Sequence, residues 1–223
     1  MSAPAWERSL EVHTAAQTHA LAAALGAVLE TGDLLVLTGE LGAGKTTFTQ
    51  GLGEGLGVRA GIISPTFVLV RIHPNLPGGP RPGGPDLVHV DAYRLESAAE
   101  IDDIDLENTM DSAVTVVEWG RGRVEHLSDS RLEVELHRTR GGAAASADTG
   151  AGPVLDFDTD DDDEPRTVVI RGFGPRWAEA PALPGAGPGH VVEPLPRFEP
   201  LPETTPGAGP RPGTTPQTPE RNP

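Results

Sequence analysis

A glycine-rich segment in the first quarter of the chain has the residue types that bind a nucleoside triphosphate. Residues 39–46 are Gly-Glu-Leu-Gly-Ala-Gly-Lys-Thr and match the Walker A pattern at every defined position. Glycines let backbone N–H groups turn inward around phosphate oxygens, and a following helix adds its positive end. Lys45 is expected to reach the outer phosphates, and the Thr46 hydroxyl to ligate Mg²⁺. The segment therefore predicts ATP and Mg²⁺ as cofactors.

The lysine of this segment is unusual within the chain. Lys45 is the single lysine among 17 basic residues, so a composition that otherwise uses arginine keeps a compact ammonium here. The planar fork of arginine would not fit the same phosphate-binding loop. This favours a phosphate site over the alternative, a glycine-rich turn without a ligand. A chain with one lysine also has no Asn-Lys-x-Asp segment for guanine, which makes a GTPase the less favoured class.

Two carboxylates follow apolar runs that are expected to form parallel strands. Asp91 follows residues 87–90, and Glu118 follows residues 114–117. Open α/β sheets bind ligands at the carboxyl ends of their strands. Asp91, on a strand expected beside that of the glycine-rich loop, is a candidate Mg²⁺ ligand, and Glu118 competes for the role. Their spacing leaves open which acid touches the metal, which orients the attacking water, and whether either only faces solvent.

A third candidate segment, Ser64-Pro65-Thr66-Phe67, lies where a γ-phosphate-sensing loop would follow the first helix of such a fold. Pro65 restricts the backbone on both sides, and Thr66 is a candidate donor toward Mg²⁺ or the γ-phosphate. An ordinary turn is the alternative for so short a segment. Trp119, directly after Glu118, fits either the core or the wall of a nucleotide cleft.

The elements that must position these residues follow from hydrophobic periodicity and capping signals. An edge strand at 10–13 is followed by a helix that begins with a Thr14–Gln17 capping box and ends at Gly32. The further expectations are a buried strand at 34–37, a helix at 46–56, strands at 87–91 and 114–118, a helical crossover at 94–110, and an antiparallel pair at 132–136 and 168–170. The predicted fold class is α/β, a P-loop NTPase-like, mostly parallel sheet flanked by helices with an antiparallel strand pair at the end.

Composition divides the chain into one domain and several appendages. The chain has 28 glycines and 23 prolines, and the prolines crowd the C-terminal end. We expect a P-loop ATPase domain over 1–180, with disordered inserts at about 74–85 and 139–165. Residues 181–223 are expected to form a disordered tail rich in proline, glycine and threonine.

Charge and cysteine content exclude several classes of protein. A net charge of −16 argues against direct contact with a nucleic acid backbone. The absence of cysteine excludes disulfides and thiol catalysis. No apolar stretch approaches the roughly 20 residues of a membrane span. The chain is therefore expected to be cytoplasmic, without a membrane partner.

Taken together, the motifs resemble the TsaE (YjeE) family of bacterial P-loop ATPases. The resemblance rests on the Walker A segment with a second threonine, Thr47, and on Ser64-Pro65-Thr66-Phe67, Asp91-Ala92-Tyr93-Arg94-Leu95 and Val117-Glu118-Trp119. It covers roughly residues 10–136 and 168–170. It implies a role in making N6-threonylcarbamoyladenosine at position 37 of certain tRNAs, with the partner proteins TsaB and TsaD, and contact with tRNA only through those partners.

The resemblance also implies roles for individual residues. Phosphate binding would fall to the loop residues Gly42, Ala43, Gly44, Lys45, Thr46 and Thr47. Thr46 and Glu118 would ligate Mg²⁺, and Asp91 would be a catalytic or metal-linked acid. Thr66 would belong to a mobile switch, and Thr14 would lie near the adenine.

Two rival functions remain open at the level of sequence. A small-molecule kinase uses the same loop but usually has a lid with several arginines, and here only Arg121 and Arg123 cluster after Glu118. The other rival is a nucleotide-gated interaction module, in which the bound state of ATP matters more than its turnover. Because no arginine finger is evident, we expect slow ATP hydrolysis by the chain alone and stimulation by partners.

Overall fold

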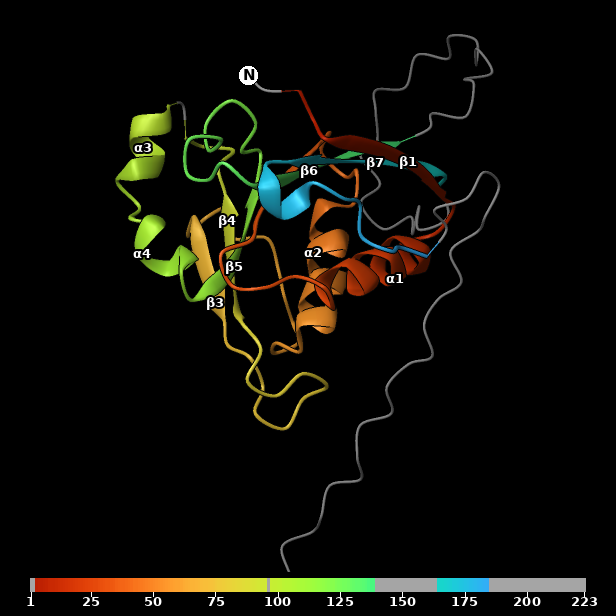
Figure 1. Ribbon diagram of the computed structural model, residues 1–223, viewed down its shortest axis with the longest axis horizontal. Coiled ribbons are helices and arrows are strands. Elements are labelled where there is room, and N and C mark those ends of the chain that lie inside the picture. Colours follow the sequence, from red (N-terminus) through yellow and green to blue (C-terminus); the bar gives the residue numbers. More distant parts are fainter. Residues whose placement is uncertain (1–2, 96, 139–163, 185–223) are drawn as a thin grey trace, which may run out of the picture.

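The computed structural model describes residues 3–95, 97–138 and 164–184 (Figure 1). Its strands are β1 (Trp6–Val12), β2 (Leu34–Gly39), β3 (Val70–His73), β4 (Asp86–Asp91), β5 (Ala113–Glu118), β6 (Arg131–Arg138) and β7 (Arg166–Phe173). Its helices are α1 (Ala15–Gly26), α2 (Lys45–Leu56), α3 (Ala98–Asp102) and α4 (Glu107–Met110), followed by a short 3₁₀ turn, η1 (Pro175–Trp177). Within these residues, no helix has both the length and the apolar character that crossing a membrane requires.

The seven strands form one mixed sheet in the order β1-β7-β6-β2-β5-β4-β3. The central strands β6, β2, β5 and β4 are parallel. Antiparallel pairs close both edges, β6–β7–β1 on one side and β4–β3 on the other. This confirms the predicted α/β class, and the predicted pair of late strands is β6–β7, with Val134 opposite Ile170.

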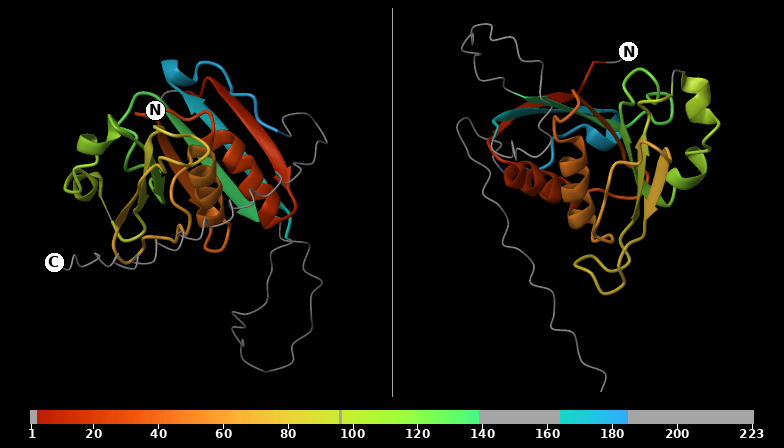
Figure 2. Two further views of the ribbon diagram at one scale, coloured as in Figure 1. Left: turned by 90° about the horizontal axis from the view of Figure 1, so that it is seen from below. Right: turned by 180° about the vertical axis from the view of Figure 1, so that it is seen from behind.

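Helices cover both faces of the sheet, and side chains of the central strands are buried on both faces. Leu35 and Leu37 of β2 pack in the core under α1 and α2, whereas Leu34 and Val36 pack in a second core with α3 and α4. Successive strand residues point to opposite faces, so a continuous apolar run suits a strand buried on both sides. The two helical layers are visible on either side of the sheet (Figure 1, Figure 2).

Glycines in α2 let the two helices of the larger core approach closely. A Cβ atom at Gly51 would lie 2.3 Å from the carbonyl oxygen of His19, and one at Gly55 would lie 2.1 Å from that of Ala23. Both carbonyls belong to α1, so these positions exclude any side chain. Gly51 and Gly55 therefore form part of the contact surface of α2 with α1.

The α1 helix begins at the predicted cap. The Thr14 hydroxyl accepts a hydrogen bond from the backbone N–H of Gln17 at 3.1 Å. The Gln17 side chain accepts one from the backbone N–H of His13 at 2.7 Å. The two side chains satisfy backbone donors that the helix leaves free at its start.

The crossover at 94–110 differs from the single helical segment that was expected. It consists of the short helices α3 and α4, separated by a turn in which Asp105 has a φ of 55°. A left-handed backbone at Asp105 cannot continue an α-helix, and aspartates compete with the helical hydrogen bonds. The apolar spacing remains useful, since Ile101 and Leu106 are both buried in the second core.

The segment 74–85, for which disorder was expected, connects β3 to β4 and makes hydrogen bonds near the ends of two helices. The Asn75 side chain donates to the carbonyl of Leu56 at 2.9 Å, and its backbone N–H donates to Asp86 at 2.8 Å. Arg81 donates to the carbonyl of Leu29 at 2.7 Å. The side chains of Asn75 and Arg81 thus satisfy carbonyls at the end of α2 and just beyond the end of α1. Side-chain hydrogen bonds of this kind hold a proline-glycine segment that forms no strand of its own.

The C-terminal boundary of the folded part also lies later than expected. Leu183 is buried in the larger core, and Arg8 donates to the carbonyl of Pro181 at 3.1 Å. Residues 181–184 therefore pack on the domain instead of beginning the tail. The rest of the predicted tail, 185–223, and most of the predicted acidic insert, 139–163, lie outside the described residues.

Candidate functional site

The loop between β2 and α2 has the backbone shape that the Walker A pattern predicts. Gly42 and Gly44 have positive φ values of 77° and 98°, which L side chains rarely adopt. Gly44 is the N-cap of α2 and makes no side-chain capping bond. The first N–H groups of α2 therefore lack a side-chain acceptor from the cap, as an anion site requires.

Lys45 points back into this loop. Its Nζ atom donates to the carbonyls of Gly39 and Glu40 at 3.0 and 3.1 Å and lies 4.0 Å from the centre of the Trp119 ring. Burial lowers the pKa of Lys45, and the carboxylates of Glu118 and Asp91 partly oppose that effect. The ammonium is thus enclosed by the loop, and Trp119, which the sequence left unassigned, forms part of its wall.

Glu118 lies directly beside the loop. It ends β5, which pairs with β2 so that Leu37 is opposite Glu118, and its side chain is almost completely buried. The Thr46 hydroxyl lies 3.4 Å from Oε1 of Glu118. Since β5 separates β4 from β2, the expectation that the strand of Asp91 neighbours the loop strand is wrong.

Asp91 instead holds the segment that begins at Ser64. Its Oδ2 atom accepts hydrogen bonds from the hydroxyls of Thr66 at 2.5 Å and Ser64 at 3.0 Å. Its Oδ1 atom accepts one from the backbone N–H of Tyr93 at 2.9 Å. The segment predicted to act as a switch is therefore anchored to the end of β4, next to Glu118 in the strand register.

The residues at the C-terminal ends of β2 and β5 suit a magnesium ion that also binds phosphate oxygens. Mg²⁺ prefers oxygen ligands and usually keeps waters, with one or two protein ligands. Thr46 and Glu118 supply such oxygens side by side. The described residues contain no group of three or more His, Asp or Glu side chains able to hold a metal ion. The donor set thus fits an ion whose remaining ligands are phosphate oxygens and water.

His89 is a member of the site that the sequence interpretation missed. Its Nε2 atom lies 2.9 Å from Oε1 of Glu118, and the His89 side chain is fully buried. One histidine in an apolar strand is more often an ordinary core residue than part of a site. In the sequence, the feature that could have indicated His89 is its position two residues before Asp91, on the same strand.

Two arginines near the loop were also missed. Arg138, at the end of β6, has its Nη1 atom 3.2 Å from the place where a Cβ of Gly42 would lie. Arg166, at the start of β7, has its Nε atom 3.6 Å from the corresponding place at Gly44. The two arginines considered from sequence have other contacts: Arg121 pairs with Glu135, and Arg123 donates to the carbonyls of Ala92 and Trp119.

The remaining predicted residues lie at defined places in the fold. Ala43 is buried within the loop, and Thr47 lies half-buried in the first turn of α2. Thr14 serves as the N-cap of α1. Its proposed proximity to adenine stays a prediction.

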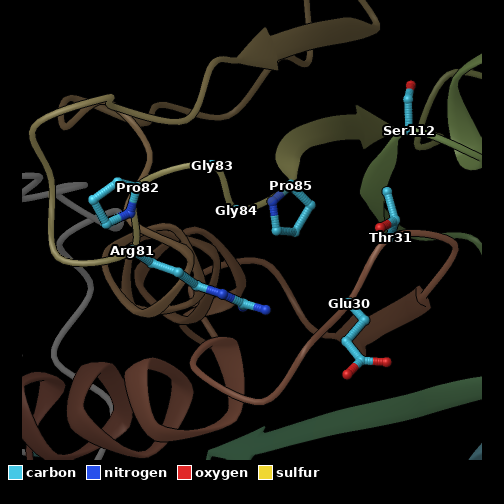
Figure 3. A pocket seen from close by; sticks show the side chains of 8 residues that line it. All are labelled: Glu30, Thr31, Arg81, Pro82, Gly83, Gly84, Pro85 and Ser112. Atoms are coloured by element: carbon cyan, nitrogen blue, oxygen red, sulfur yellow. The ribbon is translucent and has the colours of Figure 1, made fainter.

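A surface hollow of about 460 Å³ lies elsewhere in the molecule (Figure 3). It is lined by Glu30, Thr31, residues 81–85 and Ser112. Thr31 and Ser112 lie shortly before the first residues of β2 and β5. The hollow is therefore near the N-terminal ends of these strands, whereas the loop follows the C-terminal end of β2. It therefore belongs to a different part of the surface from the Lys45 site.

Comparison with known proteins agrees with this arrangement. The family model described as threonylcarbamoyl adenosine biosynthesis protein TsaE matches residues 12–144. The tRNA threonylcarbamoyladenosine biosynthesis protein TsaE of Streptomyces coelicolor is 47% identical over 157 residues, covering 70% of this chain and 90% of that protein. The protein of the same name from Mycobacterium tuberculosis is 45% identical over 127 residues, covering 54% of this chain and 73% of that protein.

A solved structure extends the similarity to the fold. The crystal structure of Bacillus subtilis YdiB aligns with a TM-score of 0.53 and 26% identity, covering 77% of this chain and 89% of that chain. The alignment therefore takes in most of the described domain. Because the family model spans more than half of this chain, and a protein of that name is 47% identical over 70% of it, the chain belongs to the TsaE family.

Proposed function

We propose that this protein binds ATP with Mg²⁺ at residues 39–47 and hydrolyses it to support the formation of threonylcarbamoyladenosine on tRNA. One observation carries the proposal: Lys45, Thr46 and Glu118 converge at the loop that joins β2 to α2. Membership of the TsaE family supplies the pathway. The loop geometry supports phosphate as the bound group.

Each side chain has a role that its environment supports. Lys45 would exchange the carbonyls of Gly39 and Glu40 for phosphate oxygens, which carry more negative charge. Thr46 and Glu118 would hold Mg²⁺, which when bound neutralises charge on the phosphates. The backbone of Gly42, Ala43, Gly44 and Thr47 would donate to the remaining phosphate oxygens.

Asp91 and Thr66 would together control the hydrolytic step. The Oδ2 atom of Asp91 is occupied by two hydroxyl donors from the 64–67 segment, so it is not poised to accept a proton from water in this arrangement. Movement of the segment would release the carboxylate. Slow hydrolysis by the protein alone, and faster hydrolysis once a partner moves the segment, follow from this contact.

The surface around the loop supports a protein partner, and the TsaE family suggests TsaB and TsaD in that role. Leu41 and Phe67 are 90% and 89% exposed, and Tyr93 is 63% exposed, so apolar side chains surround the site where a partner protein could cover them. The net charge of −16 opposes direct binding of tRNA. Contact with tRNA would therefore be made by the partners.

Phosphate release from ATP tests the proposal. We expect slow release by the full chain with Mg²⁺ and at least tenfold faster release when TsaB and TsaD are added. The absence of both stimulation and complex formation would contradict the assignment of partners. Transfer of the γ-phosphate label from ATP to a metabolite, instead of to inorganic phosphate, would identify a small-molecule kinase.

A further inference from the structure

The end of the β6–β7 ladder places two arginines beside the phosphate loop. The two residues, Arg138 and Arg166, are directly opposite each other in the strand register. Since β6 runs parallel to β2 with Leu136 opposite Gly39, Arg138 extends past the end of β2. A Cβ at Gly39 would lie 2.6 Å from the carbonyl oxygen of Leu136, which shows how closely the loop follows β6.

Arg166 is buried and has an unused donor. The residue is 7% exposed, and its buried Nε atom has no hydrogen-bond acceptor among the described residues. Its Nη1 atom donates to the backbone carbonyl of Glu164 at 3.1 Å. A buried guanidinium N–H without an acceptor destabilises a fold, and such groups are rare unless a ligand or water uses them. The Nε atom lies next to Gly44, the residue from which α2 begins.

Arg138 already binds an anionic group in this place. Its Nε atom donates to Oε2 of Glu164 at 2.6 Å, and its side chain is partly accessible to solvent. A carboxylate and a phosphate present similar pairs of oxygens to a guanidinium fork. The contact with Glu164 shows that the guanidinium of Arg138, whose Nη1 atom lies beside Gly42, can bind an anionic oxygen.

The two sides of the loop differ in charge. Glu118 and Asp91 lie on β5 and β4, on one side of β2, and the two arginines lie on β6 and β7, on the other side. A triphosphate whose outer phosphates and Mg²⁺ are held near Glu118 must extend its nucleoside end away from those acids. The arginine side is where attraction to the innermost phosphate is available.

We propose that Arg166, assisted by Arg138, binds the α-phosphate of the nucleotide on the side of the loop opposite Glu118. The proposal rests on the proposed function, because it requires ATP in the 39–47 loop. Arg166 would donate its buried Nε–H to a phosphate oxygen. Arg138 would exchange Glu164 for the nucleotide, so that Glu164 competes with the ligand for the same guanidinium.

Titration of the full chain with three ligands tests the assignment: ATP, ADP and inorganic pyrophosphate, each with Mg²⁺. We expect Arg166→Met to weaken ATP and ADP binding about tenfold or more, as the loss of a charged hydrogen bond does. Pyrophosphate, which fills the places nearest Lys45, should lose less than threefold. A change of less than twofold in ATP affinity would overturn the proposal. Equal losses of affinity for all three ligands would also overturn it, because they would mean that Arg166 only stabilises the shape of the loop.

Arg131→Met is the matched control. Arg131 is equally buried, at 6% exposed, and lies on β6 at the other end of the same ladder, opposite Phe173. It should change the melting temperature without changing any of the three affinities. If Arg166→Met does not fold, Glu164→Gln replaces it: releasing Arg138 should strengthen ATP binding about twofold to threefold, and unchanged or weaker binding would overturn the competition.

Lys45→Ala separates this inference from the proposed function. If that variant keeps full affinity for ATP, the loop is not the nucleotide site and the proposed function fails. If Lys45→Ala loses ATP while Arg166→Met binds it normally, only the role of Arg166 fails.

Discussion

The Nε2 atom of His89 lies 2.9 Å from Oε1 of Glu118, and both side chains are shielded from solvent. The same oxygen atom is 3.4 Å from the Thr46 hydroxyl. Two neighbours from different elements therefore fix the direction of one carboxylate. Hydrogen bonds to a metal ligand from groups behind it orient that ligand, and their loss typically weakens metal binding about 10-fold to 100-fold.

Removal of the imidazole should loosen Glu118 and weaken Mg²⁺ binding. We expect His89→Ala to raise the Mg²⁺ concentration for half-maximal ATP hydrolysis about 10-fold to 100-fold. Affinity for ATP without metal should change little. His73→Ala is the control, because the His73 ring lies 6.3 Å from the His89 ring but belongs to β3, which β4 separates from the strand of Glu118. Equal Mg²⁺ dependence in both variants would exclude the positioning role.

The Thr66 hydroxyl, 2.5 Å from Asp91, should matter for hydrolysis more than for binding. Thr66→Val keeps the shape of the side chain and removes the donor. Because this hydroxyl is one of the two donors that keep Asp91 occupied, we expect kcat of the chain without partners to rise at least threefold, with the ATP dissociation constant changed less than threefold. Thr115→Val is the matched control, since the buried Thr115 hydroxyl has no hydrogen-bond partner among the described residues. A normal kcat for Thr66→Val would remove Thr66 from the switch.

The close approach of α1 and α2 predicts a steep cost for one methyl group. Gly55→Ala would place a Cβ 2.1 Å from the Ala23 carbonyl oxygen, and backbone must move to accommodate it. We expect the free energy of unfolding to fall by about 2–3 kcal/mol, as overpacked cores do. Gly78→Ala, where no atom lies within 4 Å, should change it by less than about 0.5 kcal/mol. Urea denaturation measures both, and similar midpoints would contradict the packing described.

Acid should destabilise the β6–β7 side of the sheet. The Arg121 side chain, and then that of Arg171, lower the pKa of Glu135 from 4.5 to about 2. A carboxyl whose folded pKa is depressed stabilises the fold above pH 4.5 and loses that contribution as pH falls toward 2. After discounting for the partly exposed Arg121, we expect about 1–2 kcal/mol from this group.

Glu135→Gln checks that acid dependence. The variant should lose stability at pH 7 and should show a shallower decline between pH 4.5 and 2 than the unmodified protein. Glu11→Gln, at an exposed position of β1, serves as the control. If Glu135→Gln and the unmodified protein decline in parallel over that range, Glu135 does not contribute to the acid dependence.

Local patterns explain which features were predictable from sequence. The 39–46 loop, the capping of α1 by Thr14 and the apolar strands each depend on residues within a few positions of one another. Strand order does not, and it decides that Glu118, not Asp91, ends the strand beside the loop strand. The apolar runs before these two acids are alike, so their spacing could not separate them.

Other parts of the site and fold depend on pairs that are distant in sequence. His89 and Glu118 meet across 29 positions, and Arg138 meets Glu164 across 26. In the 74–85 segment, Arg81 reaches carbonyls near the end of α1, 52 and 55 positions earlier. Composition alone predicts a flexible loop there, since it carries no information about which carbonyls remain unsatisfied.

ATP binding by Lys45 variants tests the central claim most directly. Lys45 is the only lysine of the chain, and the loop encloses its ammonium, so its replacement changes the site with little other effect on charge. In calorimetric titration of the full chain with ATP and Mg²⁺, Lys45→Ala and Lys45→Arg should each weaken binding about 100-fold or more while the melting temperature without ligand stays within a few degrees. Unchanged ATP affinity in a folded Lys45→Ala protein would contradict the account.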